Sequence, residues 1–246
     1  MLKVFKNSTI YTGNEVIAGK SVVVREGIVE SVIDDSEIPQ GAELVDCRGN
    51  NLAPGFLDLQ IAGGGGFLFS SNPAPEALER IAEAITASGT TAFLIAIPTN
   101  SFDVYRKVIR VVKDNPHPAV LGLHIEGPYI NPLRRGAHIR EYIKLPEVNE
   151  LKELITLAGG VVKMITLAPE ICSREIISML NDYGIVVAAG HSNATYLQGM
   201  EGFRNGIRTT THLFNAMSQL HHRDPVGHFD RGADVVNPHV SDKQLK

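Results

Sequence analysis

The chain has 246 residues, of which 43% are hydrophobic and 20% charged, which suits one barrel-sized α/β domain or two smaller domains with a sizeable core. Its formal net charge of -4 offers no basic field, which argues against nucleic acid or an anionic membrane as main partner and favours a small polar substrate. With no membrane-length apolar run, no signal-peptide core and only two distant cysteines, Cys47 and Cys172, we expect a cytoplasmic protein without disulfides.

Residues 1 to about 50 have the pattern of a small β unit. The β-branched runs Val22-Val24 and Ile28-Ile33 are joined by Glu26-Gly27, a dipeptide suited to a tight hairpin turn. We therefore predict a domain over 1–50 built from short strands.

From Asn51 the pattern changes to alternating strands and helices. The predicted strands lie near 52–60, 91–97, 119–126, 161–167, 185–190 and 208–213, and the predicted helices near 74–88, 101–114, 146–158, 173–183 and 194–205. Such repeats predict a parallel sheet, either open and doubly wound or closed into a (β/α) barrel. Polar residues at the strand ends favour the barrel, whose active site gathers at the C-terminal ends of its strands.

Three of these predicted strands end in a side chain that can bind a metal. "LGLHIEGPY" closes on Glu126, "IVVAAGHSN" on His191 and "RTTTHLFN" on His212. A set of one carboxylate and two imidazoles leaves a coordination position open for water, as in catalytic zinc sites. Such a metal makes water nucleophilic near neutral pH, which indicates hydrolysis of an acyl or phosphoryl bond. Coincidental polarity at strand ends is the alternative.

The first barrel strand adds two accessory candidates. In "PGFLDLQIAGGGGF", Asp58 and Gln60 share one face of the predicted strand and are directed to the same interior as the metal ligands. The following "AGGGGF" lacks the lysine and spacing of a phosphate-binding loop, so we expect a flexible loop over the site.

Several ordered motifs resemble the amidohydrolase superfamily, and within it the N-acetylglucosamine-6-phosphate deacetylases. They are "PGFLDLQ", "LHIEGPYIN", "RRGAH", "TLAPE", "AGHSNAT", "THLFNAM" and "HHRDP", and they span residues 1 to about 225. The resemblance implies a (β/α) barrel with a small β-sandwich-like domain, which hydrolyses the N-acetyl group of N-acetylglucosamine 6-phosphate. It also implies a homo-oligomer, with a dimer as the expected assembly.

Residue roles follow from the same resemblance. It implies one divalent metal on Glu126, His191 and His212, with zinc expected and iron, manganese or cobalt as alternatives. His138 would polarise the acetyl carbonyl. The substrate contacts would be Ala137, His138, Asn215, Ala216 and Arg223, of which Arg223 would bind the sugar phosphate.

The sequence departs from this family after residue 225. The family continues with two more strands, a catalytic aspartate and a segment that completes the small β domain, whereas residues 226–246 form an atypical polar tail. We therefore expect six of eight barrel strands over 51–225, half of a composite sandwich over 1–50, and impaired turnover. The alternatives are a non-catalytic remnant that binds metal or sugar phosphate, a deacetylase of N-acetylgalactosamine 6-phosphate, and an amidohydrolase for another amide such as a cyclic imide.

Overall fold

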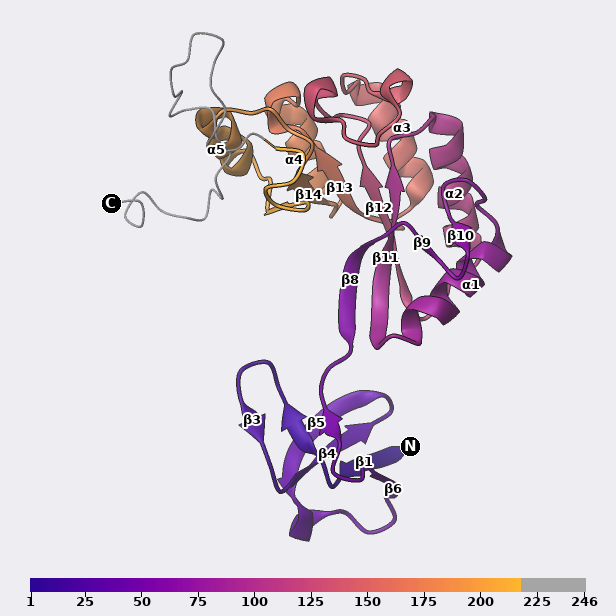
Figure 1. Cartoon of the computed structure of the whole chain (residues 1–246), viewed down its shortest axis with the longest axis vertical. Coiled ribbons are helices and arrows are strands. Elements are labelled where there is room, and N and C mark those ends of the chain that lie inside the picture. The colour runs from indigo at the N-terminus through magenta and orange to yellow at the C-terminus, as the bar shows by residue number, and fades with distance from the viewer. Residues whose placement is uncertain (218–246) are drawn as a thin grey trace. The chain divides into compact units, whose positions relative to one another are not determined.

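A computed structural model of the chain describes residues 1–217, which form two compact units. The first unit is Met1–Phe56 and the second starts at Leu57 (Figure 1). The predicted tail over 226–246 lies outside the described residues.

The N-terminal unit contains two small sheets. One has the order β5-β4-β1-β6 and the other β3-β2-β7. Their strands are β1 (Leu2–Lys6), β2 (Thr9–Tyr11), β3 (Val16–Ile17), β4 (Lys20–Arg25), β5 (Ile28–Asp34), β6 (Glu43–Asp46) and β7 (Asn51–Leu52). The predicted hairpin is confirmed: β4 and β5 pair antiparallel around Glu26 and Gly27, whose φ angles of 52° and 83° suit a two-residue turn.

The predicted strand near 52–60 is two strands in the structure. Asn51–Leu52 form β7, which pairs with β2 in the N-terminal unit, whereas Phe56–Ile61 form β8, an edge strand of the six-stranded sheet. Pro54 explains the break, because proline has no N–H to donate to a sheet. The two units consequently divide after Phe56, whereas the sequence pattern changes at residue 50.

The second unit is built on a curled sheet of six strands in the order β15-β14-β13-β12-β11-β8. Its strands are β8 (Phe56–Ile61), β11 (Thr90–Pro98), β12 (Val120–Glu126), β13 (Val162–Leu167), β14 (Val186–Ala189) and β15 (Thr209–Thr210). Each pair from β11 to β15 is parallel. The sheet therefore has the strand arrangement of a (β/α) barrel, as expected from the sequence.

Helices alternate with these strands and cover one face of the sheet (Figure 1). They are α1 (Pro75–Thr86), α2 (Phe102–Asp114), α3 (Val148–Ala158), α4 (Arg174–Asp182) and α5 (Tyr196–Arg204). The hydroxyls of Ser101 and Ser173 accept N–H groups at the starts of α2 and α4. Among residues 1–217, no helix combines the length and the apolar character needed to cross a membrane.

One large hydrophobic core joins the helices to the sheet. Helix α2 contributes Tyr105, Val108, Ile109 and Val112, all buried against strand residues such as Ile95. Full burial of each aliphatic side chain stabilises the fold by about 1.5–3 kcal/mol. This core fixes the strands, so the residues at their ends have defined positions.

The glycine-rich segment is a hairpin and not the flexible loop we expected. Gly63–Gly64 (β9) pair antiparallel with Phe67–Leu68 (β10). The hairpin lies against α1, and a Cβ on Gly65 would lie 2.7 Å from the Arg80 carbonyl oxygen. The glycines thus allow close packing on a helix, which composition alone does not distinguish from flexibility.

Candidate metal centre

The metal-ligand candidates lie at one edge of the six-stranded sheet. The register pairs Pro98 with Glu126, Glu126 with Thr166, and Ala189 with Thr210. Residues at or just beyond these positions follow the carboxyl ends of parallel strands, so they gather at that edge. Glu126, His191 and His212 come from three such ends, as the sequence pattern predicts.

Their ligand atoms form a tight triangle. Glu126 Oε1 lies 3.1 Å from His191 Nε2 and 3.1 Å from His212 Nε2, and the two imidazole nitrogens are 3.0 Å apart. Glu126 and His191 are buried, whereas His212 is partly exposed. These three residues are the group of His, Cys, Asp and Glu side chains in the described part of the chain that could hold a metal ion.

Backbone carbonyls determine which ring nitrogen of each ligand carries a proton. His191 Nδ1 is 2.8 Å from the Arg134 oxygen, and His212 Nδ1 is 3.1 Å from the Asn215 oxygen. A carbonyl oxygen only accepts, so Nδ1 donates in both rings and a neutral ring has its lone pair on Nε2. Both lone pairs consequently face the Glu126 carboxylate, which is how metal-binding histidines are usually oriented.

This donor set fits a divalent cation. With neutral rings, three electron-rich atoms lie 3.0–3.1 Å from one another, and they repel unless a positive charge lies between them. A cation or bound protons can supply that charge. Two imidazoles and one carboxylate are the ligand types that zinc and similar divalent ions prefer.

The pKa shifts show how strongly the cluster favours positive charge. Burial alone raises the pKa of Glu126, but the hydrogen bonds that His191 and His212 donate when their rings are protonated outweigh burial and bring that pKa well below its usual range. The hydrogen bond to Glu126 in turn raises the pKa of His212. Protons and a metal ion therefore compete for the same place beside a permanent carboxylate.

His138 is buried beside this triangle. Its Nε2 is 3.1 Å from His191 Nε2 and 3.9 Å from Glu126 Oε1. The Thr99 backbone N–H donates to Nδ1 of His138 at 3.0 Å, so the proton of the neutral ring resides on Nε2 and is directed at the cluster. Burial lowers the pKa of His138 to about 4, so the ring is neutral near pH 7.

The backbone is left-handed at both imidazole ligands. His191 has φ 47° and His212 φ 32°, and Phe214 and Ala216 also have positive φ. For residues other than glycine this conformation costs about 1–2 kcal/mol. Such strain at a site persists only where surrounding contacts hold it.

A hydrogen-bonded chain of buried side chains runs behind the ligands. His124 Nδ1 donates to the Leu59 carbonyl at 2.8 Å, so Nε2 must accept from the Thr166 hydroxyl at 2.6 Å. The Thr211 hydroxyl then donates to Thr166 Oγ1, also at 2.6 Å. Burial lowers the pKa of His124, which keeps it neutral. His124 thus supports the sheet behind the metal cluster.

The other predicted site residues in the described part of the chain lie on β8 and on the loops that carry His138 and His212. Asp58 accepts from the Gln60 backbone N–H and lies outside the metal-ligand group, and Gln60 is exposed. Ala137 and Asn215 are exposed on the loops that carry His138 and His212, and the Ala216 carbonyl accepts from the Ser192 N–H. Arg223 lies outside the described residues.

Sequence reasoning missed two residues that hydrogen-bond to His138 or to the residues that follow His191. Thr99 follows β11 and orients His138, and Glu170 follows β13 within the "TLAPE" motif. Both come directly after predicted strands, which is the one signal that could have singled them out.

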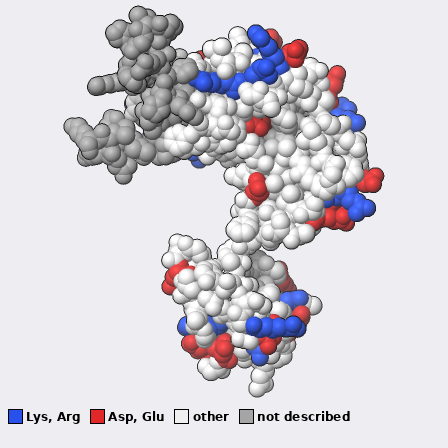
Figure 2. All heavy atoms as spheres, viewed as in Figure 1, with Lys and Arg blue, Asp and Glu red and all other residues white. Residues whose placement is uncertain are grey.

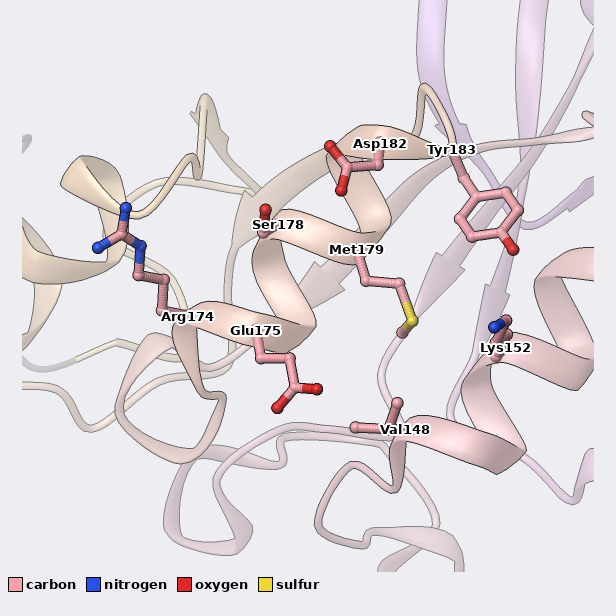
Figure 3. Close-up of a pocket in the computed structure, with 8 residues that line it drawn as sticks. All are labelled: Val148, Lys152, Arg174, Glu175, Ser178, Met179, Asp182 and Tyr183. Atoms are coloured by element: carbon pink, nitrogen blue, oxygen red, sulfur yellow. The ribbon is translucent and has the colours of Figure 1, made fainter.

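A groove elsewhere on the barrel unit is separate from the metal centre. It has a volume of about 610 Å³ and lies between α3 and α4. Figure 3 shows Val148 and Lys152 on one side and Arg174, Glu175 and Asp182 on the other.

On the face drawn in Figure 2, both units carry basic and acidic side chains, so neither positive nor negative charge covers that face alone.

Family models match almost the whole chain. Residues 4–52 match the NagA composite domain, and residues 51–244 match the amidohydrolase family. The chain is 37% identical over 221 residues to an N-acetylglucosamine-6-phosphate deacetylase of Haemophilus influenzae, covering 87% of the chain and 57% of that relative. It is 41% identical over 189 residues to the Bos taurus enzyme of the same name, covering 73% and 46%.

Solved structures show the same relationship. The N-acetylglucosamine-6-phosphate deacetylase of Pasteurella multocida matches with a TM-score of 0.88 and 32% identity, covering 98% of this chain and 62% of that one. A mutant of the Mycobacterium smegmatis enzyme in complex with N-acetyl-D-glucosamine-6-phosphate matches with a TM-score of 0.75 and 28% identity, covering 95% and 60%. The chain spans about half the length of the curated relatives it matches. With its sheet of six strands, its cluster of one glutamate and two histidines, and a family model that matches residues 51–244, this chain belongs to the amidohydrolase family.

Proposed function

We propose that this chain carries the metal-binding part of a deacetylase that hydrolyses N-acetylglucosamine 6-phosphate to glucosamine 6-phosphate and acetate. The observation that carries the proposal is the convergence of Glu126 Oε1, His191 Nε2 and His212 Nε2 at 3.0–3.1 Å, with both rings oriented by backbone carbonyls. The names of the matched relatives support the substrate.

Glu126, His191 and His212 would hold one zinc ion in this proposal. When bound, such an ion supplies Lewis acidity and lowers the pKa of water toward neutrality. The two ring N–H groups remain bonded to the Arg134 and Asn215 carbonyls, which keeps the Nε2 atoms available.

His138 acts as the hydrogen-bond donor to the acetyl carbonyl. Its Nε2–H faces the cluster, and its pKa of about 4 keeps a neutral ring with one donor proton there near pH 7. As negative charge develops on the carbonyl oxygen during attack, this fixed donor stabilises it without reorganisation. Loss of one such donor typically reduces kcat about 10²–10³-fold.

The remaining contacts concern recognition of the sugar. We assign Ala137, Asn215 and Ala216 to the acetamido-sugar and Arg223 to the phosphate, because a guanidinium binds a phosphate with two parallel hydrogen bonds. A homodimer in the cytoplasm is part of the same proposal. N-Acetylgalactosamine 6-phosphate is the alternative substrate, since phosphate and acetamide are common to both sugars.

Acetate release tests the proposal. The chain loaded with zinc should release acetate from N-acetylglucosamine 6-phosphate, more slowly than a full-length relative but faster than from N-acetylgalactosamine 6-phosphate. Calorimetry should show tighter binding of the phosphorylated sugar than of N-acetylglucosamine, with a preference of about 10–150-fold that Arg223→Ala removes. Arg204→Ala, on the exposed side of α5, is the matched control. Equal affinity for both sugars would contradict the assignment of Arg223.

Calorimetry separates binding from turnover. Selective binding of N-acetylglucosamine 6-phosphate without acetate release would identify a binding protein and would contradict the proposed catalysis. Faster acetate release from N-acetylgalactosamine 6-phosphate would identify that sugar, and not N-acetylglucosamine 6-phosphate, as the substrate.

A further inference from the structure

The carboxylate of Glu170 joins the two loops that surround His191. Glu170 lies in the 3-10 helix Pro169–Ile171, directly after β13. Its Oε1 accepts from Asn131 Nδ2 at 2.9 Å and from the Asn193 backbone N–H at 2.7 Å, and its Oε2 accepts from the Ser192 hydroxyl at 2.7 Å. Three donors from two loops thus meet one side chain.

Both loops act directly on His191. Ser192 and Asn193 follow it in the chain, and the Asn131 N–H donates to the His191 carbonyl at 2.9 Å. The turn that begins at Asn131 includes Arg134, whose carbonyl accepts from His191 Nδ1. Arg134 Nε also donates to Asn193 Oδ1 at 2.9 Å, which links the two loops a second time.

The conformation of His191 requires such support. Its φ of 47° is left-handed, and the cost of about 1–2 kcal/mol must be offset by neighbouring contacts. The bonds from Glu170 hold the two residues after His191, and the Asn131 bond holds its carbonyl. The Glu170 network therefore fixes the backbone angle and, through Arg134, the ring orientation of this ligand.

We infer that Glu170 is a positioning residue for His191, acting through hydrogen bonds to Asn131, Ser192 and Asn193. It holds the Nε2 lone pair of His191 on the point where the metal binds, and makes no contact with the metal itself. The inference rests on the metal site proposed above. Residues that orient metal ligands in this way typically contribute 10–100-fold to metal affinity.

Metal binding to folded variants tests this role. In the 246-residue chain, Glu170→Ala should weaken zinc binding, measured by chelator competition, about 10–100-fold. It should also alter the visible spectrum of the cobalt-loaded protein, which reports ligand geometry. Glu170→Gln keeps an oxygen acceptor for Asn131 and Asn193, so it should recover most of the affinity. Glu175→Gln, an exposed glutamate at the start of α4, is the control and should bind zinc like the parent chain.

The outcomes separate three explanations. If Glu170→Gln binds zinc as weakly as Glu170→Ala, negative charge and not hydrogen bonding is responsible, and the inference is wrong. Unchanged affinity and an unchanged cobalt spectrum in Glu170→Ala also overturn it. If His191→Ala retains the parent's zinc affinity, the metal site itself is misassigned, which is a failure of the proposed function.

A smaller substitution covers the case in which Glu170→Ala does not fold. Ser192→Ala removes one of the three hydrogen bonds to Glu170, together with the bond that the Ala194 N–H donates to the Ser192 hydroxyl. It should weaken zinc binding several-fold while circular dichroism shows a folded chain. Parent-like zinc affinity in both Ser192→Ala and Glu170→Gln, when Glu170→Ala is unfolded, would overturn the positioning role and leave Glu170 a residue of the fold alone.

Discussion

Substitution of Thr166 by valine should destabilise the barrel unit through two buried groups at once. Thr166 is fully buried, donates to His124 Nε2 and accepts from the Thr211 hydroxyl. Valine has nearly the same shape but no hydroxyl, so both partners lose their bond without a cavity. Each unsatisfied buried group costs about 1–3 kcal/mol, which gives about 2–6 kcal/mol for the variant.

Thr166→Ser is the matched control, because it keeps the hydroxyl and loses one methyl group at a cost of about 1 kcal/mol. Urea unfolding of the metal-free proteins, followed by circular dichroism, measures both free energies. Adding Thr211→Val to Thr166→Val removes one of the unpaired groups, so the double variant should lose less stability than the sum of the singles. A Thr166→Val variant as stable as Thr166→Ser would refute the hydrogen-bonded chain behind the metal centre.

Three further predictions concern the metal, the pH dependence and the glycine hairpin. Elemental analysis should find a divalent metal in the parent chain but not in His191→Ala or His212→Ala, and parent occupancy should fall as pH drops through the histidine range. His138, with a pKa lowered to about 4, binds its proton in the unfolded chain near pH 6.5 but not in the folded one. The unfolding free energy of the metal-free protein should therefore fall from about pH 6.5 toward pH 4, with a shallower slope in His138→Gln in urea titrations at several pH values. Gly65→Ala should lower the free energy of unfolding more than Gly66→Ala, which should lower it by about 1–2 kcal/mol. Both glycines have left-handed φ, but only Gly65 lies against a carbonyl. Equal losses would argue against close packing on α1.

The repeating strands and helices were predictable because each has local causes. Apolar runs such as Val120–Glu126 define buried strands, and Ser101 and Ser173 mark helix starts through bonds to residues three positions away. The division near residue 51 was less predictable. Asn51–Leu52 and Phe56–Ile61 form one apolar pattern in sequence, and only pairing with β2 assigns the first part to the N-terminal unit.

The convergence of Glu126, His191 and His212 was predictable for a similar reason, because strand ends meet at one edge of a parallel sheet whatever the loops do. The groups that orient the ligands were not. Thr99 reaches His138 across 39 positions through a backbone N–H, which every residue except proline has. The positions of His138 and Glu170 depend on the paths of the loops after β12 and β13, and composition does not specify those paths.

The sequential order of the six strands has a consequence for synthesis on the ribosome. Each strand from β12 to β15 pairs with the strand translated just before it, so the sheet can grow as the chain emerges. The cluster of Glu126, His191 and His212 cannot assemble in this stepwise way, because His191 follows Glu126 by 65 positions and His212 follows by another 21. At about 5–20 residues per second, the carboxylate waits roughly 3–13 s for its first imidazole and about 1–4 s more for the second. During that interval the nascent chain presents a carboxylate without its full set of partners, so this cluster is one of the last features of the unit to be completed.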